Sequence, residues 1–397
     1  MGIHPLPEGV KDRMDYTRAV RPFPGSLRER IERGGKGLTI LVLRMAAFGD
    51  ILRTLPPVRL VRAHLPEARI LWIVDDRWAP VLEGHRDLDQ VIALPRSSWR
   101  KNSRSLRSLV RLGPSMARWI ATLRSPRPDL VLDFHGNLRS GVLGALSGAP
   151  VRLGYSGHQQ KEGNRLFTTH RVPAGSRRAS RMERNLSLVR ALGIRDRVLP
   201  RGELPGVAER IPLAREIAAR LAGDGRPYAI LAPGASRRQS YKKPPAPLLA
   251  AAARQLASRG IAALVVYGPG EEADAEEVVR QAPAESRMAP PTDLRVLAAL
   301  LGGARLFVGG DSGPLHLACA VGCPVLGIYG PTDPEVNAPW GVPQEALYPP
   351  GRIYTGIKRR DRSAGGFAGL EPRMAQAAVD RVLALAGEGA EGACDGR

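Results

Sequence analysis

Short apolar runs that end in glycine or small polar residues recur along this chain, separated by segments with helical periodicity. These runs lie at 38–43, 69–74, 91–94 and 129–133 in the first half, and at 228–232, 262–267, 305–309 and 324–329 in the second. Runs of this length and composition are typical of strands buried on both faces of a parallel sheet. Because strands and helices alternate in two series, the sequence predicts an α/β protein with two doubly wound domains.

The predicted domain organisation follows from these two series. Residues 1–36 are polar and lack clear periodicity, so we expect a tail there with at most one short helix. Rossmann-like domains are expected over 37–205 and 206–350. The C-terminal segment, 351–397, is expected to contain a helix at about 372–386 that packs back on the first domain, followed by a frayed end.

The charge of the chain is unevenly distributed. The sequence holds 59 basic and 38 acidic residues, and almost all of the net charge of +21 lies in residues 1–200. This asymmetry predicts that the first half meets something anionic, such as nucleic acid, a membrane surface or an acidic substrate. Residues 90–128 hold nine basic and no acidic residues, with Arg100, Arg104, Arg107 and Arg111 on one helix face. That pattern favours a membrane-surface or polyanion contact over a solvated helix face.

The sequence also indicates a location. No apolar run approaches the roughly 20 residues that span a bilayer, and the first residues have no apolar core of a secretory signal. Three cysteines in a chain of this length fit a reducing compartment. We therefore expect a cytoplasmic protein.

The most informative loop is Gly309–Ala318, where a strand ends in glycines and a helix starts near Pro314. Glycine lets a ligand approach the backbone, and the N-terminus of a helix attracts an anion such as phosphate. The alternatives are that Asp311 or Ser312 only caps the helix and that His316 is a packed core histidine.

Two further strand-end loops carry charged side chains. Pro233–Ser236 is followed by the cations Arg237, Arg238, Lys242 and Lys243, which suit a diphosphate or form a solvated basic loop. Gly268–Glu272 places Glu271 and Glu272 where carboxylates accept ribose hydroxyls, or where acids simply start a helix.

Asp50 follows the first strand in Phe48-Gly49-Asp50. A carboxylate at that edge can take a proton from a hydroxyl, and the alternative is a cap of the following helix. The chain has no Walker loop, no G-x-G-x-x-G after its first strand and no metal-ligand spacing, so we expect neither a cofactor nor a metal.

Five blocks, in order, resemble the bacterial heptosyltransferase family. They are Phe48–Pro56, Asp129–Ser140, Arg152–Tyr155, Pro233–Ser236, and Asp311–Leu317 with the following Tyr329–Pro334. The likeness extends from about Leu38 to Gly341. Members of this family are inverting glycosyltransferases of the GT-B fold, with two Rossmann-like domains facing a central cleft, and they build the inner core of lipopolysaccharide.

The resemblance implies roles for individual residues. Asp50 would be the general base, and Lys242 would stabilise the diphosphate. The family's Lys-x-Trp-Pro pattern falls on Lys242–Pro245 with Pro244 in place of Trp, which leaves Lys242 and Lys243 both open. The implied donor-binding residues are Ser236, Lys243, Glu271, Glu272, Asp311, Ser312, Gly313 and His316. The implied acceptor-binding residues are Arg100, Lys101, Arg104, His135, Asn137 and Arg139.

The function that the resemblance implies is transfer of heptose from ADP-heptose to a Kdo-lipid A type acceptor, without a metal. The partners would be a nucleotide sugar, an anionic glycolipid and the inner face of the cytoplasmic membrane, and not nucleic acid. Three alternatives stay open: another nucleotide sugar or surface glycan, a sugar-nucleotide epimerase or hydrolase on the same fold, or a binding protein without catalysis.

Overall fold

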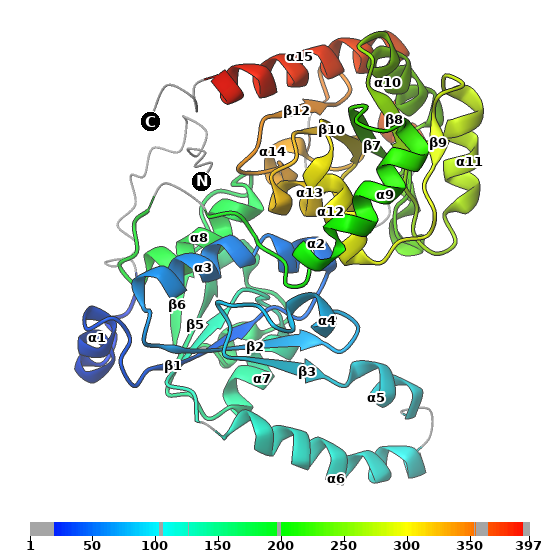
Figure 1. The fold of residues 1–397 in the computed structure, drawn as a ribbon. Helices are drawn as coiled ribbons and strands as arrows, with labels where there is room; N and C mark the ends of the chain where they lie inside the picture. Colours follow the sequence, from blue (N-terminus) through cyan, green and yellow to red (C-terminus); the bar gives the residue numbers. More distant parts are fainter. Residues whose placement is uncertain are drawn as a thin grey trace. The chain divides into compact units, whose positions relative to one another are not determined.

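The computed structural model describes residues 20–102, 106–125, 127–196, 200–352, 354 and 364–391 (Figure 1). It divides into two compact units, and the boundary falls between Pro200 and Arg201. The boundary predicted from the sequence, after residue 205, is a few residues late. Arg201 already belongs to the C-terminal unit because its guanidinium packs against Gly322.

The N-terminal unit is built on one parallel sheet in the order β3-β2-β1-β4-β5-β6. Its strands are β1 (Thr39–Leu43), β2 (Arg69–Asp75), β3 (Gln90–Leu94), β4 (Leu130–Asp133), β5 (Val151–Ser156) and β6 (His170–Pro173). Ile40, Leu41 and Leu43 have no exposed surface, which explains why β1 lies in the centre of the sheet. This order is that of a doubly wound fold.

Helices connect these strands. They are α1 (Gly25–Glu32), α2 (Phe48–Leu52), α3 (Leu55–His64), α4 (Ala79–Leu82), α5 (Arg96–Asn102), α6 (Leu106–Leu123), α7 (Leu138–Leu146) and α8 (Arg181–Arg190), with the short 3₁₀ helices η1 (Gly157–Gln159) and η2 (Asn164–Leu166). The segment after β1 forms two helices because Pro56 and Pro57 lack a backbone N–H and start a new helix.

Residues 20–36 contain one short helix, α1, as predicted, but they do not form a polar tail. Val20 and Leu27 are buried, with 6 % and 3 % of their surface exposed. Arg30 Nη2 contacts Asp129 Oδ1 at 2.7 Å, next to the start of β4. The apolar contacts and this ion pair make the segment part of the N-terminal unit.

The C-terminal unit repeats the same architecture, with the strand order β12-β11-β10-β7-β8-β9. Its strands are β7 (Tyr228–Ala232), β8 (Ala262–Val265), β9 (Arg287–Met288), β10 (Leu306–Gly310), β11 (Val325–Ile328) and β12 (Gln344–Leu347). Its helices are η3 (Ala208–Arg210), α9 (Ile211–Ala222), η4 (Arg237–Lys242), α10 (Ala246–Ser258), α11 (Glu272–Gln281), α12 (Leu294–Gly303), α13 (Gly313–Val321), α14 (Pro334–Asn337), η5 (Ala364–Phe367) and α15 (Pro372–Glu391).

The C-terminal helix corrects one prediction. It was expected to pack on the first domain, but α15 lies against α10, β11 and β12 of its own unit (Figure 1). Ala375, Ala378, Val379 and Val382 are fully buried in the core that they share with α10. The small alanines let the two helices approach closely, and this apolar stripe fixes where α15 packs. Among the described residues, no helix is both long and apolar enough to cross a membrane.

Candidate active site

Several of the predicted site residues lie at the switch point of each sheet. In the N-terminal unit β1 and β4 are neighbours, and in the C-terminal unit β7 and β10 are neighbours, where the chain reverses its direction of winding. Loops at the carboxyl ends of such strands leave a crevice for a ligand. Asp50 and His135 follow β1 and β4, and Lys242 and Asp311 follow β7 and β10.

The carboxylate of Asp50 is surrounded by three arginines. Its Oδ1 accepts hydrogen bonds from Arg181 Nη1 at 3.0 Å and Arg53 Nη1 at 3.2 Å, and it lies 3.6 Å from Arg44 Nη2. Arg53 and Arg44 are buried, and the Asp50 side chain is 18 % exposed. Three guanidinium groups around one carboxylate leave an excess of positive charge.

Asp50 does not occupy a helix-cap position. The N-cap of α2 is Ala47, three residues earlier, and the N-cap of α3 is Thr54. Asp50 lies in the first turn of α2 and pairs with Arg53, the C-cap of the same helix, and with two arginines from other elements. Arg44 follows β1 directly, and Arg181 begins α8, 131 residues away in sequence. Arg181 could not be predicted from the sequence, because nothing local links it to Asp50.

A buried carboxylate orders the loop after β4. Asp133, which is 1 % exposed, accepts hydrogen bonds from the backbone N of His135 and of Gly136 at 3.0 and 2.9 Å. It also accepts from Ser140 Oγ and Asn164 Nδ2, both at 2.8 Å. Burial raises the pKa of Asp133, and these hydrogen bonds oppose the rise. Sequence reasoning missed Asp133, whose only signal is its place at the end of a buried strand.

His135 lies near the Asp50 carboxylate and is neutral. Burial lowers the pKa of His135 to about 3, the charge of Arg44 lowers it further, and the charge of Asp50 opposes both effects. The Nδ1 atom of His135 is buried and has no hydrogen-bond partner among the described residues. A neutral imidazole with an open ring nitrogen can exchange a hydrogen bond with a sugar hydroxyl.

The other two predicted acceptor-binding residues of this loop, Asn137 and Arg139, have different surroundings. Asn137 is the N-cap of α7, and its Oδ1 accepts a hydrogen bond from Ser140 N at 3.1 Å. Ser140 Oγ completes the capping box by accepting from Asn137 N. Arg139 is exposed in the first turn of α7, and its charge contributes to the low pKa of His135. The side chain of Asn137 is thus engaged by its own helix.

The predicted basic region begins in α5. Arg100 and Lys101 lie in this helix, and Arg104 lies outside the described residues. The rings of Trp99 and Trp119 meet edge to face at 5.6 Å and join α5 to α6. Trp119 Nε1 also donates to the backbone oxygen of Ala93 in β3 at 2.8 Å, which anchors α6 on the sheet.

In the C-terminal unit, the loop after β10 forms the N-terminus of α13. Ser312 occupies the N-cap position without making the side-chain cap bond, and its Oγ is buried without a hydrogen-bond partner among the described residues. Pro314 lies in the first turn, and Gly322 ends the helix with φ of 85°. Ser312 therefore does not make the side-chain cap bond that the capping alternative required. Its hydroxyl and the first backbone N–H groups of α13 suit an anionic oxygen ligand.

Lys242 reaches the same loop. Its Nζ donates to Asp311 Oδ2 at 2.9 Å, and Asp311 Oδ1 lies 3.5 Å from His316 Nε2. His316 is buried and stacks on Trp340 with ring centroids 5.6 Å apart. Close approach of the two loops requires glycine at 310, where a Cβ would lie 2.8 Å from Lys242 O. An ammonium group is therefore held beside the N-terminus of α13.

The two adjacent lysines point to different partners. Lys243 Nζ pairs with Asp274 Oδ2 of α11, whereas Lys242 pairs with Asp311. This geometry favours Lys242 for the anion-binding loop, a choice that the sequence left open. Ser236 is exposed at the start of η4 and makes no side-chain cap bond.

The two adjacent glutamates also differ. Glu271 Oε2 accepts from Gly268 N at 2.9 Å, and its carboxylate lies where a Cβ of Gly234 would stand. Glu271 therefore joins the loops after β7 and β8. Glu272 is exposed and begins α11, which fits the simple helix-start alternative.

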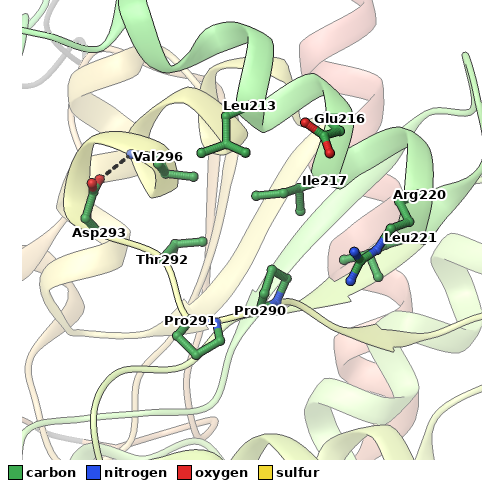
Figure 2. A pocket seen from close by; sticks show the side chains of 10 residues that line it. All are labelled: Leu213, Glu216, Ile217, Arg220, Leu221, Pro290, Pro291, Thr292, Asp293 and Val296. Carbon is green, nitrogen blue, oxygen red and sulfur yellow. Dashed lines mark hydrogen bonds between the residues drawn. The ribbon is translucent and has the colours of Figure 1, made fainter.

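A pocket of about 390 Å³ lies elsewhere, between α9 and the segment that leads into α12 (Figure 2). It is lined mainly by apolar side chains such as Leu213 and Ile217, and by none of the predicted site residues. One of its two carboxylates, Asp293, caps α12 by accepting a hydrogen bond from Val296 N at 2.8 Å. Within the described ranges, no group of three or more His, Cys, Asp or Glu residues is placed to hold a metal ion.

Comparison with known proteins agrees with this arrangement. Residues 116–354 match the model of glycosyltransferase family 9 (heptosyltransferase), which is more than half of the chain. The chain belongs to this family. It is a glycosyltransferase, as the family resemblance of the five sequence blocks predicted.

Curated relatives in the family are enzymes of lipopolysaccharide synthesis. The chain is 26 % identical over 301 residues to lipopolysaccharide heptosyltransferase 3 of Escherichia coli, covering 75 % of this chain and 84 % of that one. It is 26 % identical over 312 residues to lipopolysaccharide heptosyltransferase 1 of Pseudomonas aeruginosa, covering 78 % and 83 %.

Solved structures of family 9 confirm the fold. The crystal structure of a family 9 glycosyltransferase from Veillonella parvula superposes with a TM-score of 0.70 at 19 % identity, covering 88 % of this chain and 98 % of that one. An E. coli heptosyltransferase with ADP-2-deoxy-2-fluoro heptose has a TM-score of 0.65 at 22 % identity, covering 86 % and 99 %. The predicted fold class, GT-B with two Rossmann-like domains, is thus confirmed.

Proposed function

We propose that this glycosyltransferase moves a heptose from ADP-heptose to the inner core of lipopolysaccharide, on an acceptor of the Kdo-lipid A type. The transfer inverts the anomeric centre, uses Asp50 as general base and needs no metal ion. The names of the relatives and the nucleotide sugar in the E. coli structure support this donor and acceptor. The observation that carries the proposal is a carboxylate among arginines at the switch point of the first sheet.

On the acceptor side, this arrangement combines a base with anion-binding groups. Asp50 takes the proton from the acceptor hydroxyl as that oxygen attacks the anomeric carbon. The arginines around Asp50 attract the carboxylates and phosphates of the acceptor. The neutral imidazole of His135 contributes a hydrogen bond to a sugar hydroxyl, since its Nδ1 is open and buried.

On the donor side, the C-terminal unit stabilises the departing diphosphate. The Lys242 ammonium, the Ser312 hydroxyl and the first N–H groups of α13 supply positive charge and hydrogen-bond donors. These groups are preorganised, because Asp311 holds Lys242 in place before a ligand binds. They stabilise the negative charge of the departing diphosphate, which a divalent cation does in other nucleotide-sugar enzymes.

The first test replaces Asp50 by Asn. Loss of a general base should lower kcat by about 10²–10⁴ and leave donor affinity unchanged, because the donor groups lie in the other unit. Asn keeps the shape of Asp but removes the charge that neutralises the buried Arg44 and Arg53. Stability is therefore measured in parallel by urea unfolding, and activity is compared at a temperature where the variant is folded.

The matched control is Asp129→Asn, since Asp129 is also paired with an arginine but lies at the start of β4, away from the switch point. It should keep its turnover. A folded Asp50→Asn enzyme with turnover within a few-fold of the wild type would remove Asp50 from the role of base.

The second test replaces Ser312 by Ala. Removing a hydroxyl that binds a charged oxygen typically costs about 1.5–3 kcal/mol, so the donor Kd should rise by roughly 10- to 100-fold. The fold should persist, because Ser312 makes no cap bond. Ser258→Ala, on the exposed end of α10, is the control. An unchanged donor Kd by calorimetry would exclude Ser312 from the diphosphate site.

We further propose that the basic region places the enzyme at the inner face of the cytoplasmic membrane. Residues 90–128 carry nine basic and no acidic residues, and residues 113–118 of α6 are all exposed, including Met116 at 40 %. Cationic and apolar side chains on one anchored helix suit an anionic lipid surface.

Vesicle co-sedimentation tests this placement. Binding to anionic vesicles should weaken between low and physiological salt. It should be lost on reversal of three arginines to Glu: Arg100, Arg104 and Arg107. Reversal of three exposed arginines of the C-terminal unit should have little effect: Arg215, Arg254 and Arg280. Equal binding by both triple variants would show that the overall charge, and not this region, attracts the vesicles.

A further inference from the structure

Arg181 differs from the other two arginines at Asp50. Arg53 and Arg44 are buried, and Arg44 is also held by donating to Phe134 O at 2.6 Å. The side chain of Arg181 is 42 % exposed, although its Nη1 lies 3.0 Å from Asp50 Oδ1, nearer than the guanidinium nitrogens of Arg53 and Arg44 at 3.2 and 3.6 Å. Arg181 can therefore reach solvent-borne groups, whereas the other two are enclosed.

The position of Arg181 in its own helix adds to this difference. It is the first residue of α8, directly after the N-cap Ser180, whose side chain accepts from Glu183 N. The N-terminus of a helix carries about +0.5 charge, which is unfavourable for a cation. The guanidinium is therefore stabilised mainly by an anion in front of it, and Asp50 supplies that anion in this structure.

The surroundings contain more positive than negative charge. The charged and titratable groups that face or act on this place come from several elements: Asp50, Asp133, Arg44, Arg53, Arg181, His135, Arg139, Tyr155, Lys161 and Arg184. His135 is neutral, and burial raises the pKa of Tyr155 beyond the physiological range, so neither removes the excess. The excess of positive charge favours the binding of a second anion beside Asp50.

We infer that Arg181 is a positioning residue that couples acceptor binding to the base: an anionic group of the acceptor draws the Arg181 guanidinium away from Asp50 and thereby frees the Asp50 carboxylate to accept a proton. Without that anion, the guanidinium occupies Oδ1 and weakens the base. Arg181 thus makes turnover depend on an acidic acceptor. This inference rests on the proposed function, and it adds the acceptor chemistry that the same site selects.

The test compares two acceptors: one of the Kdo-lipid A type and the same molecule with its carboxylates converted to methyl esters. The wild-type enzyme should show kcat/KM at least tenfold higher for the charged acceptor. In Arg181→Ala that ratio should fall toward one, because kcat/KM should rise for the ester and fall for the charged acceptor. Arg178→Ala, on the exposed loop before α8, is the control and should keep the wild-type ratio.

A pH profile on the ester separates this role from a structural one. Removal of a cation within about 4 Å of a carboxylate weakens its ionisation by about one pH unit or more. The acid limb of kcat/KM in Arg181→Ala should therefore move to higher pH by that amount, and Arg181→Lys should restore the limb. An equal loss on both acceptors with an unmoved limb would overturn the inference. Absence of turnover with ADP-heptose in the wild type would instead refute the proposed function.

Discussion

The Lys242–Asp311 pair allows a prediction that separates binding from stability. Asp311 is 5 % exposed, and the Lys242 Nζ at 2.9 Å is its main counter-charge. Lys242→Met removes the ammonium and leaves the buried Asp311 carboxylate without this counter-charge, while His316 Nε2 stays 3.5 Å from its Oδ1. Removing one partner of a buried ion pair costs about 3–5 kcal/mol, and we expect the lower end because His316 stays.

The double variant Lys242→Met with Asp311→Asn should behave differently. It removes both charges, so the carboxylate that loses its ammonium in the single variant is also gone. Replacement of a buried ion pair by neutral groups is often close to neutral in stability. We expect it to recover most of the stability that Lys242→Met loses. Donor affinity should stay low in both variants, because neither retains the ammonium beside α13.

Hydrogen exchange of peptides from β10 and α13 measures the stability of the C-terminal unit in both variants. A loss of about 3 kcal/mol corresponds to roughly a hundredfold lower protection in Lys242→Met, and the double variant should return to within about tenfold of the wild type. Peptides from β1 and β4, in the other unit, are the internal control. A single variant as protected as the wild type, or a double variant no better than the single one, would refute the reasoning.

Three other predictions concern the fold around the site. The pKa of His135 is lowered from 6.5 in the unfolded chain to about 3 in the folded protein. The stability that this shift contributes is therefore complete above pH 6.5 and is lost as the pH falls toward 3. Between pH 7 and pH 5 the free energy of unfolding, measured with urea, should fall by about 1–2 kcal/mol less in His135→Gln than in the wild type. Asp133→Ala should destabilise the N-terminal unit by about 3 kcal/mol or more in the same assay, because two buried backbone N–H groups lose their acceptor. Gly310→Ala should cost about 1–3 kcal/mol by calorimetric melting, since its Cβ meets Lys242 O, whereas Gly302→Ala, with nothing within 4 Å, should be neutral or stabilising.

The fold was largely predictable because its central strands are buried on both faces. β1, β7 and β10 are continuous apolar runs bounded by glycine or polar residues, and each was expected within a residue or so of its observed bounds. Four strands toward the sheet edges, β5, β6, β9 and β12, were not predicted, although the edge strand β3 was expected at 91–94. β12 is the polar segment Gln344–Leu347, and β9 has two residues.

Residues of the candidate site could be predicted only where they lie close in sequence to a recognisable strand end. Asp50 and Asp311 could be proposed from the sequence because each follows a buried strand at the carboxyl edge of a sheet, where ligands bind. Arg181 was not found, because its contact with Asp50 joins distant parts of the chain and arginine is frequent throughout. The packing of α15 was mispredicted because an alanine-rich helix indicates that it packs closely, but not against which partner.

The most direct measurement of the central claim is transfer of radiolabelled heptose from ADP-heptose to a Kdo-lipid A type acceptor by the purified protein. We expect label on the lipid, one ADP released for each heptose transferred, and unchanged rates in excess EDTA. The Asp50→Asn protein, folded under the same conditions, should transfer at least a hundredfold more slowly. Label released as free sugar, no labelled lipid from the wild-type protein, or full activity in Asp50→Asn would contradict the account.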